Sequence, residues 1–118
     1  MITNFEELTC DLTEEELMLV PLIISGLKTK TKETAITGDE IVAKINILKN
    51  KKVLSPVKLR KIINFIRSRS MLPVIATSKG YFCSVDPNEL NKQYQSLMER
   101  IKAMQSAADG ILKIKQSL

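Results

Sequence analysis

The 118-residue chain contains no histidine and only two cysteines, Cys10 and Cys83. Without histidine there is no Ser-His or Cys-His nucleophile pair, no histidine general base and no mixed Cys/His zinc site. The cysteines match no Cys-x-x-Cys spacing, so we interpret them as small apolar residues in a reducing cytoplasm rather than as a disulfide or a metal site. No carboxylate pair or Gly-rich phosphate loop is visible either. The sequence therefore predicts a protein that is not an enzyme and has no cofactor or metal.

The low content of glycine, proline and aromatic residues and the lack of long apolar runs exclude further classes of protein. Glycine and proline number four each and no tract is repetitive, so the composition is not that of a disordered chain. Two Tyr and three Phe, with no aromatic run, disfavour a stacking platform for RNA or single strands. No apolar run reaches the roughly 18 residues of a membrane span, and the first residues lack the blocks of a signal peptide. We expect one compact cytoplasmic domain with an appended element and no membrane partner.

The net charge of +5 is strongly segregated along the chain. Residues 1–27 hold six acids and no base, residues 28–84 hold thirteen bases and three acids, and residues 85–118 carry a net charge of +1. Clustered Lys and Arg favour a surface that faces a polyanion, because neutralised phosphates release counterions. The alternative is an ordinary solvated basic face. The acidity of residues 1–27, which include an acidic N-terminal segment over 1–12, favours protein contacts at that end, or masks the basic face when DNA is absent.

The first predicted helix starts at a capping box, Thr13-Glu14-Glu15-Glu16, and runs to about Leu27. Its middle is apolar on every side, as in a buried helix. Pro21 removes a backbone donor, so we expect a kink or break there. Gly26 is a plausible C-terminal stop.

Two more helices and a hairpin follow. Residues 28–34 are predicted to form a mobile basic loop, and the capping box Thr37-Gly38-Asp39-Glu40 starts a helix that runs to about Asn46. Eight residues, 47–54, then separate it from a third helix over 55–69, which opens on Ser55-Pro56. β-Branched and aromatic residues on both sides of a Ser-Lys-Gly turn predict a β-hairpin over 74–85.

A long helix is predicted from Pro87 to about Lys115, behind the cap Asp86-Pro87-Asn88-Glu89. The sequence thus divides into a domain over 1–85 and a C-terminal helix within 86–118. Its expected fold class is mainly α with a small β-hairpin.

The order helix, helix, helix, hairpin is that of a winged helix-turn-helix domain. Residues 36–41, Ile-Thr-Gly-Asp-Glu-Ile, resemble the start of the second helix of that family. Residues 75–82, Ile-Ala-Thr-Ser-Lys-Gly-Tyr-Phe, resemble the wing of biotin-repressor-type domains, and the Gly-Tyr pair is the best local match. The resemblance implies a helix in the major groove of DNA and a wing on the backbone or minor groove. Residues 97–104 are more weakly similar to the C-terminal helix of small phage-encoded proteins with such a domain.

The predicted helix 55–69 has two unlike sides. Leu59, Ile62, Ile63 and Ile66 follow the i, i+3, i+4, i+7 pattern of a core face. The other side carries the donors that read guanine, an amide that pairs with adenine and a methyl-bearing Val57 for thymine. We expect Arg60, Lys61 and Asn64 at bases or nearby phosphates, and Arg67 and Arg69 at the backbone. The alternative is the wet side of an amphipathic helix, with Phe65 in the core. The candidate DNA-binding residues are Lys58, Arg60, Lys61, Asn64, Arg67, Ser68, Arg69 and, on the wing, Lys79.

The predicted wing offers further contacts. Lys79 at its tip is expected to meet a phosphate or the minor groove, where the Thr77 and Ser78 hydroxyls could also donate to phosphate. Tyr81 and Phe82 are expected to pack the hairpin onto the helices.

The C-terminal helix carries a heptad seam, with apolar residues at alternating steps of four and three. Such a stripe must be buried, either against a second copy in a coiled coil or against the chain's own domain. We expect a homodimer, whose two recognition helices favour a two-fold related DNA site. The candidate dimerisation residues are Leu90, Tyr94, Leu97, Ile101, Met104, Ala108 and Ile111.

The leading hypothesis is therefore a non-enzymatic, sequence-specific double-stranded DNA-binding protein. It predicts a transcriptional or phage-type regulator in the cytoplasm, associated with the nucleoid when bound to DNA. The alternative is a winged-helix module for protein–protein interaction or assembly that docks through its C-terminal helix.

Overall fold

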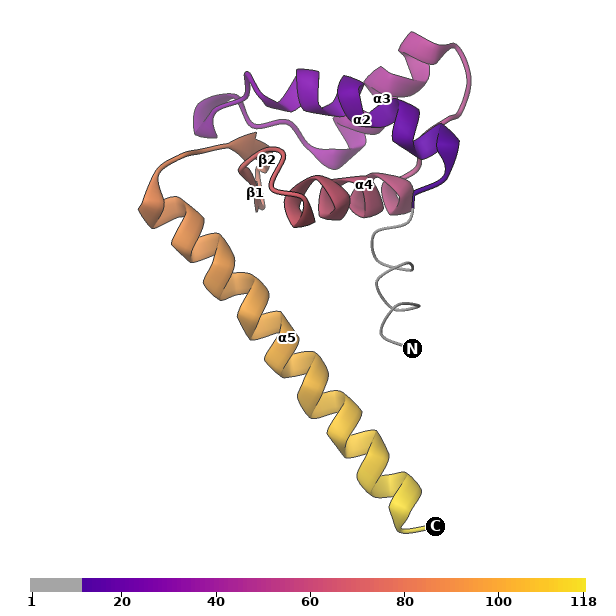
Figure 1. The fold of residues 1–118 in the computed structure, drawn as a ribbon, viewed down its shortest axis with the longest axis vertical. Coiled ribbons are helices and arrows are strands. Elements are labelled where there is room, and N and C mark those ends of the chain that lie inside the picture. Colours follow the sequence, from indigo (N-terminus) through magenta and orange to yellow (C-terminus); the bar gives the residue numbers. More distant parts are fainter. Residues whose placement is uncertain (1–11) are drawn as a thin grey trace. The chain divides into compact units, whose positions relative to one another are not determined.

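A computed structural model describes residues 12–118, which fold into helices and one small antiparallel sheet (Figure 1). The chain divides into a unit that ends at Val85 and a second unit, Asp86–Leu118. The prediction of a mainly α fold with a hairpin is confirmed. Cys10 and all but the last residue of the acidic segment 1–12 lie outside the described residues. The elements are α2 (Glu14–Leu27), η1 (Lys32–Thr34), α3 (Gly38–Lys49), α4 (Pro56–Ser68), β1 (Val74–Thr77), β2 (Gly80–Cys83) and α5 (Pro87–Gln116).

The predicted helix starts are confirmed because each cap is satisfied locally. At α2, Thr13 Oγ1 accepts from the Glu16 amide at 3.1 Å while Glu16 Oε1 accepts from the Thr13 amide at 2.9 Å. Thr37 and Glu40 form the same reciprocal pair at α3. The Ser55 hydroxyl caps α4 by accepting a hydrogen bond from the Lys58 amide, and Pro56 lies in the first turn.

Helix α2 differs from expectation at three points: it has no break at Pro21, it does not stop at Gly26 and it is not buried on every side. Pro21 neither breaks nor ends the helix, which continues to Leu27, and Pro21 lies on its exposed side. The carbonyl that loses its amide donor there can be hydrated, which lowers the cost of proline. Gly26 is not the stop, because the last turn closes through the Lys28 amide and the Ile24 carbonyl. The helix is also not buried all round, since Met18 is 70% exposed.

The segments on either side of α3 also differ from expectation. The predicted loop 28–34 contains a turn of 3₁₀ helix, η1. Helix α3 continues three residues past Asn46, to Lys49, and ends at Asn50 in the left-handed conformation with φ 56°. Six residues, 50–55, therefore connect α3 to α4, instead of the eight predicted.

The connector is held by one side chain, Asn46. Its Oδ1 accepts from the amides of Val53 and Leu54, both at 2.9 Å, and its Nδ2 donates to the Leu54 carbonyl at 3.0 Å. These bonds satisfy backbone groups of a segment that has no regular structure. Val53 and Leu54 are thereby held in the core, immediately before the cap of α4.

The hydrophobic core lies between α2, α3 and α4, with the hairpin packed at one side (Figure 1). Strands β1 and β2 pair antiparallel, with Thr77 opposite Gly80, so that Ser78 and Lys79 form the turn. A third strand segment of one residue joins them: Ile36 and Tyr81 exchange both backbone hydrogen bonds, at 3.0 and 2.7 Å. This bridge attaches the hairpin to the chain just before α3.

Gly80 makes that attachment possible. Its φ is +124°, and a Cβ there would lie 2.5 Å from the Ile36 carbonyl oxygen. Only glycine combines this conformation with so close a backbone approach.

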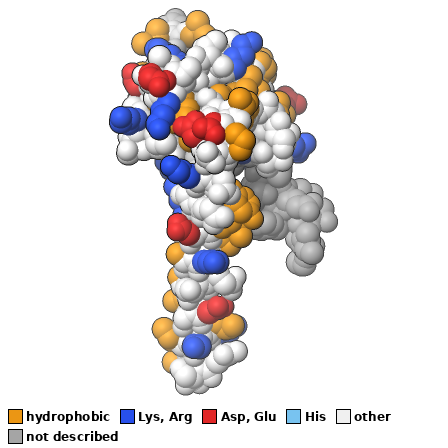
Figure 2. Space-filling model, turned by 90° about the vertical axis from the view of Figure 1, so that its left-hand side faces the viewer, with side chains coloured by type: hydrophobic (Ala, Val, Ile, Leu, Met, Phe, Trp, Pro, Cys, Tyr) orange, Lys and Arg blue, Asp and Glu red, His pale blue; other side chains and the backbone are white. Residues whose placement is uncertain are grey.

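The second unit is dominated by α5. Asp86 caps it by accepting from the Asn88 amide, and the helix runs for 30 residues without a buried residue. Along this helix, Figure 2 shows apolar side chains at the surface between charged ones. Among the described helices, none combines the length and apolar composition needed to cross a bilayer.

Candidate nucleic-acid interface

Helix α4 separates its core face from its polar face as predicted. Leu59, Ile62, Ile63 and Ile66 are each at most 2% exposed and pack against α2 and α3. The opposite side is exposed at Val57, Asn64 and Ser68. Because the core face fixes the rotation of the helix, the register of the polar face is settled.

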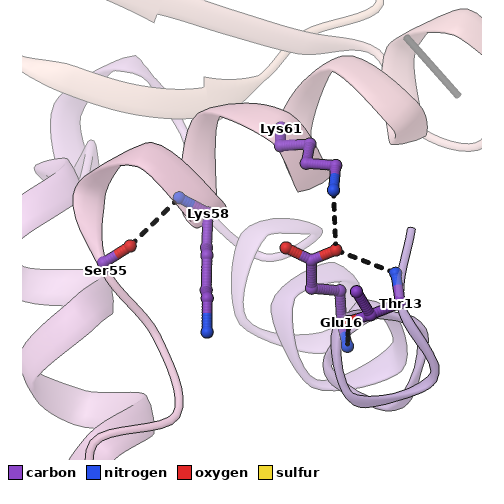
Figure 3. A network of polar contacts seen from close by, with 5 residues as sticks. All are labelled: Thr13, Glu16, Ser55, Lys58 and Lys61. Atoms are coloured by element: carbon purple, nitrogen blue, oxygen red, sulfur yellow. Dashed lines mark hydrogen bonds and ion pairs between the residues drawn. The ribbon is translucent and has the colours of Figure 1, made fainter. Parts of the chain in front are cut away.

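Lys61 is the one residue of the predicted base-reading trio that the fold uses internally. Its Nζ lies 3.0 Å from Glu16 Oε1, on the first turn of α2 (Figure 3). Glu16 is only 4% exposed, so its carboxylate needs such a partner. The Lys61 side chain is 36% exposed and lies at the edge of the polar face. We therefore assign Lys61 to the joint between α2 and α4 and leave it out of the candidate interface.

Glu16 remains ionised because three groups stabilise its charge. Burial raises its pKa, but the hydrogen bonds from Thr13 and the neighbouring Lys61 ammonium outweigh that effect, and the pKa lies below its ordinary value. The exposed Glu40 has a lowered pKa through its own capping bonds with Thr37. The carboxylate of Glu16 thus acts both as a helix cap and as an ion-pair partner between helices.

Three more predicted contacts, at the C-terminal end of α4, also have partners within the fold. Arg67 is half-buried, and its Nε donates to the Val74 carbonyl at 3.3 Å. The Ser68 hydroxyl donates to the Phe65 carbonyl at 3.0 Å. The Arg69 guanidinium lies 4.9 Å from the centre of the Phe65 ring. Arg69 is nevertheless exposed, so a guanidinium held over a ring can still face a ligand.

Four of the predicted residues are exposed and have no side-chain hydrogen bond or ion pair within the described part of the chain. They lie on two elements of the same unit, the polar face of α4 and the hairpin turn. In Figure 3 no dashed line joins the Lys58 side chain to the Glu16–Lys61 pair. We call these four residues the open basic set: Lys58, Arg60, Asn64 and Lys79.

The hairpin turn is held by its own side chains. Thr77 Oγ1 accepts from the Lys79 amide at 3.2 Å and donates to the Gly80 carbonyl at 3.3 Å, so this hydroxyl is used inside the turn. Phe82 is 2% exposed and Tyr81 is half-buried. Tyr81 packs against the helical core, which confirms the expectation for this ring, and Phe82 is confirmed only as buried.

Sequence reasoning missed three residues that position this surface. Glu16 was predicted to cap a helix but not to pair with Lys61. Asn46 was predicted only as the end of a helix. Ile36 was not predicted to form a strand. Each acts through a contact with a distant segment, for which the sequence carries no local pattern. For Asn46, its place beside a predicted connector was the one available signal.

No three His, Cys, Asp or Glu residues between 12 and 118 are grouped as metal ligands. Cys83 is a free, half-buried thiol, and burial raises its pKa. This fits a small apolar residue at the edge of the core better than a reactive thiol.

All seven candidate dimerisation residues lie on α5, and the structure buries none of them. Leu97 is half-buried and Leu90 is 36% exposed, whereas Tyr94, Met104 and Ile111 are 57%, 72% and 68% exposed.

Comparisons with known proteins find no matching family model, curated protein or solved structure.

Proposed function

We propose that residues 12–85 form a winged-helix domain that binds double-stranded DNA in a sequence-specific manner. In this proposal α4 enters the major groove and the β1–β2 hairpin contacts the backbone. The observation that carries the proposal is the open basic set, whose exposed donors lie on α4 and on the hairpin turn of the same unit. The protein would act as a non-enzymatic transcriptional or phage-type regulator in the cytoplasm, at the nucleoid when bound.

The arrangement of the elements supports the winged-helix assignment. Between residue 12 and the hairpin lie three α-helices, and the last of them, α4, is packed by the other two on one face. The Ile36–Tyr81 bridge adds a short third strand between α2 and α3. A hairpin fixed in this way is a rigid second contact beside the helix, which is what a wing requires.

The electrostatics of α4 support the choice of DNA as the ligand. The helix contains four basic residues and no acidic one, so its first turn carries no acid either. Its positive N-terminal dipole is therefore not neutralised within its own sequence. Lys49, Lys51 and Lys52 lie before it on exposed positions and extend the positive field.

The chemistry of the polar face supports base reading as well as phosphate binding. An arginine pairs bidentately with guanine, and an asparagine with adenine, in the major groove. Arg60 and Asn64 are four residues apart and thus neighbours on one side of α4. Lys58 and Lys79 supply point charges for phosphates on either side.

The test is fluorescence anisotropy of the full chain with a random duplex over a salt series. Lys58→Ala/Arg60→Ala removes two charges from α4, and the control Lys102→Ala/Lys113→Ala removes two exposed charges from α5. We expect the first variant to weaken binding by about 1–3 kcal/mol per contact, and the control to bind like wild type. An equal loss of DNA affinity in both variants would show that only the net charge matters, and it would contradict the assignment of the surface to α4. If the wild-type chain does not bind the duplex at low salt, the proposed DNA binding is wrong.

A second candidate function rests on the exposed apolar seam of α5. In that case the domain is an interaction or assembly module, and α5 is its docking element. The same titration separates the two functions, since the module predicts no salt-dependent DNA binding.

A further inference from the structure

We propose that α5 pairs with α5 of a second copy of this chain in an antiparallel orientation, with Leu97 opposite Ala108 of the partner. The starting observation is the helix itself. Its 30 residues include none that is buried, although Ile101 and Met104 at its middle are 55% and 72% exposed. A continuous apolar stripe of this length on one helix is not stable in water without a covering surface.

Contacts within a single helix contribute little to its stability in water. One side-chain hydrogen bond, Gln105 to Asp109 at 2.9 Å, spans a turn of its C-terminal half. Gly110 lies in that half as well, and glycine weakens a helix interior. Burial of the seam therefore has to supply most of the stability of this helix.

The seam has the spacing of a coiled coil, which points to another helix as its cover. A second copy of α5 fits this seam best, because the side chains of two seams match each other when the two helices run in opposite directions. Core a positions hold Tyr94, Ile101, Ala108 and Lys115, and core d positions hold Leu90, Leu97, Met104 and Ile111.

A parallel pair would set unfavourable layers against each other. Ala108 would face Ala108 and leave a thin layer, and Lys115 would face Lys115 with like charge. The flanking e and g positions set orientation through ion pairs in parallel coiled coils. Here they include one charged residue, Arg100, so no such pair can form. These positions are Asn91, Met98, Gln105 and Leu112 at e, and Gln93, Arg100, Ala107 and Ile114 at g.

Antiparallel pairing resolves both problems, because each a position then faces a d position of the partner. With Leu97 opposite Ala108, a large residue fills the space beside a small one. The same register sets Tyr94 opposite Ile111 and Ile101 opposite Met104. It also sets Leu90 opposite Lys115. These four kinds of layer repeat symmetrically about the middle of the helix, as an isologous interface requires.

The ends of the helix carry opposite charge, which also favours this orientation. Asp86 and Glu89 lie at the N-terminal end, and Lys113 and Lys115 at the C-terminal end. In the proposed register Lys115 lies opposite Leu90 and therefore one residue from Glu89 of the other copy, and the helix dipoles are aligned favourably. At 1.5 Å per residue, the first turns of the two helices would lie about 45 Å apart.

The first experiment measures the mass of the full chain by light scattering. We expect twice the mass of one chain. Ile101→Glu/Met104→Glu should return the mass to that of one chain, whereas Ala103→Glu/Ser106→Glu, two charges on the opposite side of the same helix, should keep it doubled. Circular dichroism checks that the rest of the chain stays folded. A wild-type monomer, or equal effects of both variants, overturns the proposal.

The second experiment determines the orientation. Tyr94 is replaced by the photoreactive p-benzoylphenylalanine, an aromatic substitution at a seam position, and cross-linked tryptic peptides are sequenced. Antiparallel pairing predicts a link to the peptide 103–113, which contains Ile111. A link to the peptide 93–100 of the second copy indicates a parallel pair and overturns the proposal. Neither readout involves DNA, so failure here is distinguishable from failure of the proposed DNA binding.

Discussion

The ammonium of Lys61 lies 3.0 Å from Oε1 of Glu16, and this ion pair joins the middle of α4 to the first turn of α2. The sequence predicts another role for each residue: Glu16 as part of a helix cap and Lys61 as a DNA contact. The pair holds the exposed face of α4 in one orientation relative to the rest of the unit.

A double-mutant cycle should detect this coupling. Glu16→Gln keeps an oxygen for the Thr13 amide but removes the charge, and Lys61→Met leaves the carboxylate without its ion-pair partner. We expect each change to lower the free energy of unfolding, with a coupling of about 1 kcal/mol, because Lys61 is partly exposed and the pair is screened. The measurement is urea unfolding followed by circular dichroism. Additive losses would show that the pair contributes nothing to the joint.

Acid should destabilise the protein partly through the same carboxylate. The folded pKa of Glu16 is lowered, so its contribution is present above the ordinary glutamate pKa and disappears as the pH falls through the folded value. Unfolding midpoints in urea should therefore fall between pH 7 and about pH 3 by more in wild type than in Glu16→Gln. Identical pH dependence in the two proteins would contradict the assignment.

Gly80 should be intolerant of a side chain, in contrast to Gly26. Gly80→Ala forces a Cβ against the Ile36 carbonyl at a positive φ, and we expect a loss of at least about 1–3 kcal/mol. At Gly26, within α2, a Cβ meets nothing within 4 Å, so Gly26→Ala should stabilise by about 0.5–1 kcal/mol. Thermal unfolding compares the two variants. A neutral Gly80→Ala would mean that the hairpin is not held against Ile36.

Removal of the Asn46 side chain should loosen the connector between α3 and α4. Asn46→Ala leaves the Val53 and Leu54 amides without their acceptor, and we expect a loss of about 2–3 kcal/mol. Asn46→Asp keeps the acceptor and loses the donor to Leu54, so its loss should be smaller. Hydrogen exchange at Val53 and Leu54 reports the effect locally. Unchanged protection of these amides in Asn46→Ala would contradict the account.

The elements could be predicted from the sequence because their signals are local. The caps at Thr13, Thr37 and Ser55 involve residues within one turn of the helix, and their side chains bond as expected. The core face of α4 follows from a period within a single helix. The predicted break at Pro21 is wrong because the cost of a proline within a helix depends on whether water can reach the carbonyl that has lost its donor. The neighbouring residues in the sequence do not reveal this exposure.

The joints of the fold could not be predicted, since they depend on which segments meet in space. The Lys61–Glu16 pair joins residues 45 positions apart. The Ile36–Tyr81 bridge involves one residue of a segment that carries no strand pattern. As a result, the candidate interface could be predicted as a helix face, but the removal of Lys61 from it required the structure.

The most direct test of the central claim is a titration of the isotopically labelled full chain with duplex DNA, followed by amide chemical shifts in NMR spectra. DNA binding through α4 and the hairpin predicts shifts on the exposed side of α4, around Arg60 and Asn64, and in the turn at Lys79. The core side of α4 and the seam of α5 should be little changed. Shifts confined to α5, or none at low salt, would contradict DNA binding through this face.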